Sequence, residues 1–264
     1  MFDFDTGPIA DLTQNGVTMI RPNSVPIRHF QVFGERSSGT NFVSHIIDKH
    51  LDIARSKAYG WKHGFPAMSS ISPRSLIVVL FREAEPWVRS MYNKPWHTTA
   101  HMRGLEFSDF IRAEWHTVIR GGINSKDQPV ETKFWKPLQL DRDPLTGRPF
   151  ANIVQLRNAK NRGFLSFAYR DCNAVLARYE TVRDNPEGFL ADLGRTFGIA
   201  QTSDYVPFQD VTGGGRWARR RKVKAPAELC PEDREFVLSE LDLETEMLVG
   251  YDYTAPDAEV FAAA

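Results

Sequence analysis

The chain has 264 residues, 42% hydrophobic and 25% charged, which is an ordinary composition for one large globular domain or two small ones. Its formal net charge is zero, so no global field draws it to nucleic acid or to a membrane surface. Two cysteines, Cys172 and Cys230, exclude a disulfide-dense scaffold. We find no signal peptide and no apolar run of about 20 residues, so we expect a cytoplasmic protein without a membrane span.

The first half of the chain alternates predicted strands and helices. Residues 29–33 read as a short apolar strand, and residues 40–54 carry apolar side chains at helical spacing. The near-continuous apolar run at 75–81 is typical of a parallel strand buried on both faces. A helix is expected at 85–92, with Pro86 in its first turn.

The second half continues this alternation. Strands are predicted at 152–156 and 173–179, and helices at 185–198 and about 231–248. Together the elements predict an α/β fold of three layers around a mostly parallel central sheet, in a single domain over residues 1–264. The less regular region 93–150 is expected to be an insertion or a lid.

The segment FGERSSGTNF joins the first predicted strand to the first predicted helix. Such a turn places unpaired N–H groups and the positive end of the helix dipole at the carboxyl edge of the sheet, where anions bind. Small and hydroxyl residues suit a phosphate at this position, and the turn has four of them: Ser37, Ser38, Gly39 and Thr40. Arg36 adds a positive charge. A plain strand–helix turn with Thr40 as the N-cap is the competing interpretation.

Two differences separate this turn from the loop of nucleoside triphosphatases. The lysine of G-x-x-x-x-G-K-[ST] is missing, and Arg82 follows the strand 75–81 where a magnesium-binding Asp is expected. We therefore predict a phosphate site without catalytic magnesium and no metal centre. Arg82 and Ser90, eight residues apart, could grip one phosphate; a local salt bridge from Arg82 is the alternative.

In combination, these segments resemble the sulfotransferases that use 3′-phosphoadenosine-5′-phosphosulfate (PAPS). In that family a strand–loop–helix binds the 5′-phosphosulfate, and SSGTNF (37–42) resembles it. An Arg and a Ser eight residues apart bind the 3′-phosphate, as Arg82 and Ser90 would here. The family's strand with Lys and His near the sulfuryl group is similar to WKHGFP at 61–66.

Two later segments extend the resemblance. RYETVRDNPEGF is similar to the family's Tyr-Glu dipeptide and following helix, which implies that Tyr179 contacts the adenine. The basic segment 216–224 is similar to the segment that closes over the 3′-phosphate, with Arg221 and Lys222 aligned best. In chain order the resemblance covers about residues 29–252, and 93–150 is unmatched.

The resemblance implies the following site. Lys62 stabilises the sulfuryl group and His63 is the general base. Glu35, His97 and His101 are the reserve bases. The implied cofactor-binding residues are Arg36, Ser37, Ser38, Gly39, Thr40, Asn41, Arg82, Ser90, Tyr179, Arg221 and Lys222. The acceptor is a hydroxyl or amine of a small molecule or glycan, and 93–150 would lie on its side of the site.

The sequence departs from the family pattern in three places. Ser37 stands where the family has its loop lysine, His63 is one residue away from the family histidine, and Val223 replaces a glycine. A kinase-like enzyme and a non-catalytic nucleotide-binding relative therefore stay open as alternatives. The chain's tryptophans are interpreted as core, with a sugar-binding cleft as the alternative; they include Trp87, Trp96, Trp115 and Trp135.

Overall fold

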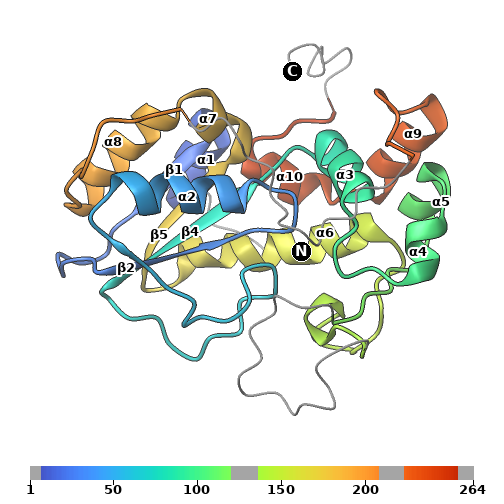
Figure 1. Cartoon of the computed structure of the whole chain (residues 1–264), viewed down its shortest axis with the longest axis horizontal. Coiled ribbons are helices and arrows are strands. Elements are labelled where there is room, and N and C mark those ends of the chain that lie inside the picture. Colours follow the sequence, from blue (N-terminus) through green and yellow to red (C-terminus); the bar gives the residue numbers. More distant parts are fainter. Residues whose placement is uncertain (1–6, 120–135, 208–222, 255–264) are drawn as a thin grey trace.

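The computed structural model describes residues 7–119, 136–207 and 223–254 and has an α/β architecture (Figure 1). Within these residues the sheet has five strands in the order β1-β5-β4-β2-β3. Strands β2 to β5 run parallel, and β1 pairs antiparallel with β5. The mostly parallel sheet is confirmed, whereas the edge strand β1 was not predicted. The strands are β1 (Val17–Ile20), β2 (His29–Phe33), β3 (Ala54–Arg55), β4 (Ser75–Phe81) and β5 (Asn173–Arg178).

Helices cover both faces of the sheet. Figure 1 shows α2 and α8 on one face and α6 on the other, which is compatible with the three layers that we predicted. The helices are η1 (Gly7–Ile9), α1 (Ala10–Asn15), α2 (Thr40–His50), α3 (Ala84–Asn93), α4 (Ala100–Gly104), α5 (Phe107–Arg112), η3 (Gln139–Asp141), α6 (Ile153–Leu165), η4 (Ser166–Tyr169), α7 (Tyr179–Asp184), α8 (Pro186–Phe197), α9 (Pro231–Glu240) and α10 (Leu243–Val249).

Local sequence signals set the ends of α8, as predicted. The side chain of Asn185 accepts a hydrogen bond of 3.0 Å from the amide of Gly188, and Pro186 occupies the first helical position. Gly198 ends the helix with φ = 64°, a left-handed conformation that glycine adopts at little steric cost.

The predicted strand at 152–156 is wrong, because this segment begins α6. The side chain of Asn152 accepts hydrogen bonds of 2.9 Å from the amides of Val154 and Gln155, and so caps the helix. A short apolar run of β-branched residues does not distinguish a buried helix from a strand. The capping asparagine, which we read as part of the strand, was the signal that we missed.

The predicted last helix at 231–248 is two helices. Leu241 has an extended backbone, with φ = −69° and ψ = 140°, so α9 ends there. The side chain of Asp242 then accepts a hydrogen bond of 3.3 Å from the amide of Thr245 and starts α10. The first predicted helix, at 40–54, likewise ends earlier than expected, at His50.

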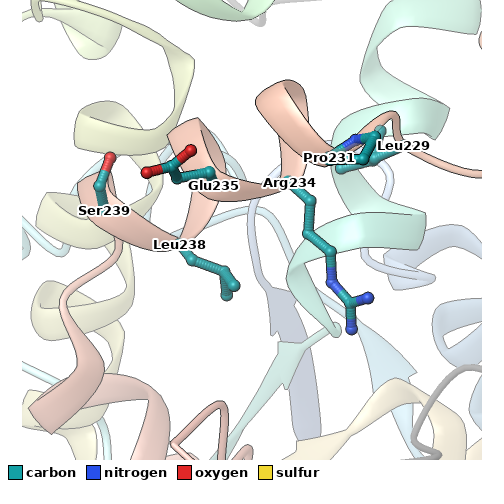
Figure 2. A pocket seen from close by; sticks show the side chains of 6 residues that line it. All are labelled: Leu229, Pro231, Arg234, Glu235, Leu238 and Ser239. Atoms are coloured by element: carbon teal, nitrogen blue, oxygen red, sulfur yellow. The ribbon is translucent and has the colours of Figure 1, made fainter.

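A shallow groove of about 610 Å³ runs along α9 (Figure 2). Figure 2 shows Arg234 and Leu238 pointing to the same side of this helix. None of the residues that we predicted for the functional site lies among the described lining residues, which are Leu229, Pro231, Arg234, Glu235, Leu238 and Ser239.

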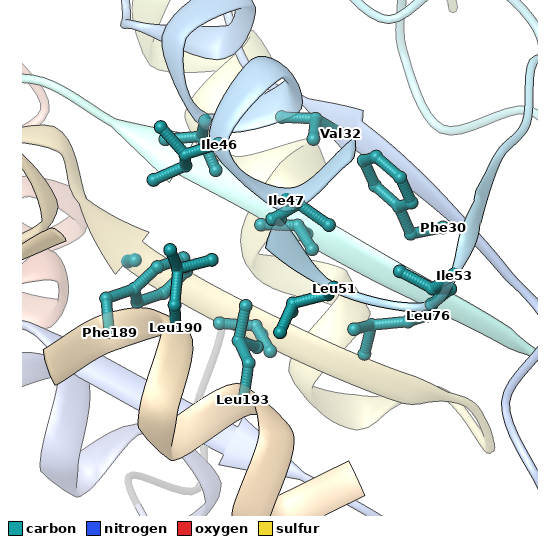
Figure 3. Close-up of a cluster of buried hydrophobic side chains, with 14 of the residues drawn as sticks. Phe30, Val32, Ile46, Ile47, Leu51, Ile53, Leu76, Phe189, Leu190 and Leu193 are labelled. Atoms are coloured by element: carbon teal, nitrogen blue, oxygen red, sulfur yellow. The ribbon is translucent and has the colours of Figure 1, made fainter. Parts of the chain in front are cut away.

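The side chains of the sheet alternate between two hydrophobic cores. Leu76, Val78 and Leu80 of β4 face the core under α2 and α8, and the intervening residues of β4 face the core beside α6. Figure 3 shows Ile46 and Ile47 of α2 packed with Leu190 and Leu193 of α8 over the sheet. Because β4 is buried on both faces, its uninterrupted apolar run is explained by its central position.

A third core lies beyond the carboxyl edge of the sheet and combines α3, α5, α6 and α9. Trp87 and Trp115 are buried in it, which agrees with their interpretation as core residues. Trp96 is half-buried, and Trp135 lies outside the described residues. Of the helices that the structure describes, none has both the length and the apolar character to cross a membrane.

Candidate anion-binding and catalytic site

Three neighbouring strands deliver the predicted site residues to one edge of the sheet. The register pairs Phe33 at the end of β2 with Val79 of β4, and Phe81 at the end of β4 with Arg178 of β5. The loop 34–40, Arg82 and Tyr179 follow these strand ends directly. The parallel topology therefore brings together residues that are up to 145 positions apart.

The loop 34–40 bends through three residues with positive φ. Gly34 has φ = 148°, Ser37 has 66° and Gly39 has 78°. Gly39 is the N-cap of α2 and no side chain caps this helix, so the interpretation of Thr40 as an ordinary N-cap is wrong. The first amides of a helix have no partner within the helix. With no cap from a side chain, these donors and the helix dipole can serve an anion.

Arg82 and Tyr179 pack directly on this loop. Nη1 of Arg82 donates a hydrogen bond of 2.7 Å to the carbonyl oxygen of Ser37, and its guanidinium lies 5.2 Å from the ring centroid of Tyr179. A Cβ atom added to Gly39 would lie 2.1 Å from Cδ2 of Tyr179. Ser90 is half-buried two turns further along, on α3.

Lys62 and His63 both reach the loop 34–40. They lie in a turn after β3 and outside any strand, so they need not point to opposite sides. Nζ of Lys62 donates a hydrogen bond to Oδ1 of Asn41, in the first turn of α2. Nδ1 of His63 lies 2.6 Å from the carbonyl oxygen of Gly34. His63 therefore contacts the start of the loop, and Lys62 contacts the first turn of the helix that follows it.

Main-chain and side-chain contacts fix the turn that carries Lys62 and His63. The amide of Gly34 donates a hydrogen bond of 3.1 Å to the carbonyl oxygen of Lys62. The buried side chain of Gln31 donates to the carbonyl oxygen of Gly60 at 2.9 Å and accepts from the amide of Tyr59 at 3.0 Å. Sequence analysis missed Gln31; the one available signal was a polar residue inside an apolar strand.

Burial and neighbouring cations lower the pKa of both residues. Burial, with Arg55 and Lys57 nearby, lowers the pKa of Lys62 to about 8. Burial, with further repulsion from Lys62, lowers the pKa of His63 well below its ordinary value. The neutral imidazole donates through Nδ1 to Gly34, which leaves Nε2 as the nitrogen with a free electron pair.

Glu35 and Arg36 belong to a ring of four buried charges, which we call the charged quartet: Glu35, Arg36, Asp141 and Lys160. Nε of Arg36 lies 2.8 Å from Oε1 of Glu35, and its Nη2 lies 2.6 Å from Oδ2 of Asp141. Nζ of Lys160 closes the ring at 2.6 Å from Oδ1 of Asp141 and 2.6 Å from Oε2 of Glu35. Burial alone would raise the pKa of Asp141, but Arg36 and Lys160 lower it below its ordinary value.

This ring holds the side chain of Arg36 inside the protein. Nη1 of Arg36 also donates a hydrogen bond of 2.9 Å to the carbonyl oxygen of Trp96, and its guanidinium carbon lies 5.7 Å from the ring centroids of both Trp61 and Trp115. Nε1 of Trp87 donates a hydrogen bond of 2.8 Å to the carbonyl oxygen of Arg36. The structure thus does not bring Arg36 together with Lys62 and Arg82, and both oxygens of Glu35 face cations.

Sequence analysis missed Asp141 and Lys160. Asp141 comes from the irregular region 93–150, and Lys160 lies in α6 beyond the mispredicted segment 152–156, so no local pattern connected them to the loop. The described parts of 93–150 pack on the site through Trp96, Trp115 and Asp141.

Some predictions fall outside what the structure describes. Arg221 and Lys222 lie in the segment 208–222, outside the described residues. Within the described ranges, no group of three or more His, Cys, Asp or Glu side chains is arranged to hold a metal ion. The ring of His97 makes a T-shaped contact with the ring of Trp61. Burial lowers the pKa of His97 to about 4, and the nearby charge of Arg36 contributes to this shift.

Comparisons with known proteins add no relative. No protein-family model matches the chain, and searches of curated proteins and of solved structures gave no significant match.

Proposed function

We propose that the protein transfers a sulfuryl group from PAPS to a hydroxyl or amine of an acceptor, which could be a small molecule or a glycan. The loop 34–40 and Asn41 would hold the 5′-phosphosulfate with backbone amides and hydroxyl groups. Arg82 and Ser90, with Arg221 and Lys222, would recognise the 3′-phosphate. Tyr179, beside the loop, would face the adenine.

One observation carries this proposal. Two consecutive residues, Lys62 and His63, contact the first turn of α2 and the start of the loop that leads into it, and no side chain caps this helix. A cation and a neutral imidazole beside an anion-binding loop are the groups that sulfuryl transfer needs. The loop has no Walker lysine of its own, and Lys62 reaches its helical end from the neighbouring turn.

The chemistry assigns a separate role to each residue. The bond between sulfur and the bridging phosphate oxygen breaks, and a bond forms between sulfur and the acceptor oxygen or nitrogen. Adenosine 3′,5′-bisphosphate leaves with the electron pair, and Lys62 stabilises the negative charge that develops on the bridging oxygen. Nε2 of His63 takes the acceptor proton, a role usually worth about 10²–10⁴-fold in rate.

Glu35 and Arg36 have no direct role in this proposal. Their charged groups are buried, with side-chain exposures of 1% and 3%, and are paired within the charged quartet. A general base requires a free electron pair beside the acceptor, and a phosphate ligand requires a free donor. We therefore assign the base to His63 and the loop cation to Lys62.

Calorimetry with three nucleotides tests the cofactor. Adenosine 3′,5′-bisphosphate should bind more tightly than AMP or ATP, and EDTA should not change its affinity. Preferential binding of Mg²⁺-ATP, abolished by EDTA, would instead favour a kinase-like enzyme. Turnover of labelled PAPS against a panel of hydroxyl and amine acceptors then tests catalysis, and bisphosphate binding without transfer to any acceptor would indicate a non-catalytic relative.

A further inference from the structure

The charged quartet connects three parts of the chain that are distant in sequence. Glu35 and Arg36 belong to the loop 34–40, Asp141 ends η3, and Lys160 lies near the middle of α6. Asp141 and Lys160 have side-chain exposures of 0%. In this ring each carboxylate faces both cations, so its two positive and two negative charges balance.

Lys160 also reaches beyond the quartet to the turn that carries the predicted base. Its Nζ donates a hydrogen bond of 2.7 Å to the carbonyl oxygen of His63. The side chain of the same His63 contacts the carbonyl oxygen of Gly34, at the start of the loop. His63 is thus held at its main chain by Lys160 and at its ring by Gly34, and both attachments lead back to the loop 34–40.

Stability alone does not explain such an arrangement. Removing a charge from water is costly, and well-packed apolar residues of similar volume often stabilise a fold as well as a buried ion pair does. A closed ring of short ion pairs does fix geometry, because each side chain is restrained from two directions. Catalytic geometry is sensitive to displacements of about 1 Å.

We propose that Lys160 and Asp141 are positioning residues of the candidate site, which hold the main chain of His63 and the first half of the loop 34–40 in one fixed arrangement. Asp141 fixes Arg36 and Lys160 relative to each other, and Lys160 joins Glu35 to His63. The catalytic part of this inference rests on the proposed function, and the geometric part does not.

The test uses the double variant Lys160→Met/Asp141→Asn. It removes one charge of each sign and leaves the pair of Glu35 and Arg36 neutral, so its melting temperature should lie closer to the wild-type value than that of either single variant. The matched control is Arg162→Met/Asp242→Asn, which removes another ion pair of α6, one whose Arg162 side chain is 49% exposed. The control should leave the site unchanged.

Two readouts separate positioning from mere packing. In the double variant, kcat should fall about tenfold to a hundredfold, while the affinity for adenosine 3′,5′-bisphosphate changes by less than about threefold. The ¹⁵N signals of the His63 ring should also shift, because the carbonyl contact with Lys160 is lost. A folded double variant with wild-type kcat and wild-type ring signals would overturn the inference.

The wild-type protein provides a test that needs no folded variant. The groups that face His63 include Lys62, Arg36 and Lys160, all cationic, and the ring of Trp61. Held among them, the ring should titrate below the ordinary histidine pKa and should carry its single proton on Nδ1 at neutral pH. Titration near the ordinary histidine value of about 6.5 would contradict the inferred placement. If the wild type fails to bind the bisphosphate, the proposed function is wrong. The ¹⁵N signals of the His63 ring then still test whether this ring is held as we infer.

Discussion

Nη1 of Arg82 donates a hydrogen bond of 2.7 Å to the carbonyl oxygen of Ser37. This contact joins the end of β4 to the middle of the loop 34–40, at a residue with φ = 66°. It places the guanidinium of Arg82 beside the loop and against the ring of Tyr179. We expect a nucleotide with a 5′-phosphate and a 3′-phosphate to contact the loop with the first and Arg82 with the second.

Replacing Arg82 by Ala should remove most of the preference for adenosine 3′,5′-bisphosphate over AMP. Hydrogen bonds to a charged group are worth about 1.5–3 kcal/mol, so bisphosphate affinity should fall by about tenfold to a hundredfold, and AMP affinity should change less. Calorimetry measures both. Arg89→Ala is the control, because Arg89 donates instead to the carbonyl oxygen of Pro226. Equal affinities for the two nucleotides in the wild type would refute this recognition.

Replacing His63 by Ala should lower kcat by at least about 10²-fold, with little change in bisphosphate affinity, because the general base is lost. The matched control is His63→Asn, whose amide can still donate to the carbonyl oxygen of Gly34 but cannot accept the acceptor's proton. A base role predicts that both variants are slow. If both the activity and the melting temperature of the Asn variant return to wild-type values, His63 acts only through packing.

Bisphosphate affinity should fall as the pH rises through about 8. Lys62 is cationic below its pKa of about 8 and neutral above it, so its attraction for phosphate is present at lower pH and lost at higher pH. Calorimetry between pH 6.5 and pH 9 measures the change. In Lys62→Met, binding should be weak and nearly independent of pH in this range, whereas Lys62→Arg should bind well up to pH 9. A wild-type profile as flat as that of the Met variant would exclude Lys62 from the site.

Replacing Gly39 by Ala should abolish bisphosphate binding and lower the melting temperature. The new Cβ would meet the ring of Tyr179 at 2.1 Å, and the backbone has φ = 78°, where an L side chain is strained. Adding Tyr179→Ala should relieve the clash and recover part of the lost stability. Gly60→Ala is the control. Gly60 also has a positive φ, of 90°, but no atom lies within 4 Å of the Cβ that the substitution would add. Unchanged binding in Gly39→Ala would mean that the loop amides do not hold the ligand.

Replacing Glu83 by Gln should stabilise the protein at pH 8 but not at pH 4.5. Burial, with Glu180 and Glu85 nearby, raises the pKa of Glu83 to about 7. The folded state then binds more protons than the unfolded state between about pH 4.5 and pH 7. The ionised Glu83 therefore destabilises the folded state increasingly as the pH rises through this window, and the loss of stability is complete above it. Because Glu83 is partly exposed, we expect a gain of about 2–4 °C, the effect of about 1 kcal/mol. Thermal melts at both pH values measure it; equal gains at both would assign the effect to packing.

Much of the fold could be predicted from the sequence because its signals are local. The uninterrupted apolar run of β4 indicated a strand buried on both faces, and Asn185, Pro186 and Gly198 marked both ends of α8. The glycines and hydroxyl residues between β2 and α2 marked the loop that joins this strand to this helix. These features depend on backbone sterics and on hydrogen bonds between residues close in the chain, which a sequence displays directly.

Other features required the tertiary structure. The apolar pattern of Ile153 and Val154 suits a helix or a strand, and in the fold these residues pack in the third core as part of α6. The edge strand β1 exists because β5 offers it an edge. The sequence suggested Arg36 as a phosphate ligand, since a cation next to the loop attracts an anion. In the folded chain Asp141, from 105 residues away, holds this side chain inside the protein.

The sequence by itself determined the strands and helices that flank the loop, and the tertiary structure decided which side chains gather around it and where each one points. The order of the strands in a parallel sheet brings Arg82 and Tyr179 to the loop, and the turn after β3 lets Lys62 and His63 face it together. The direction of each charged side chain is set by its buried partners, because an unpaired charge in the interior is far more costly than a paired one. Those partners come from distant parts of the chain, and only folding brings them together.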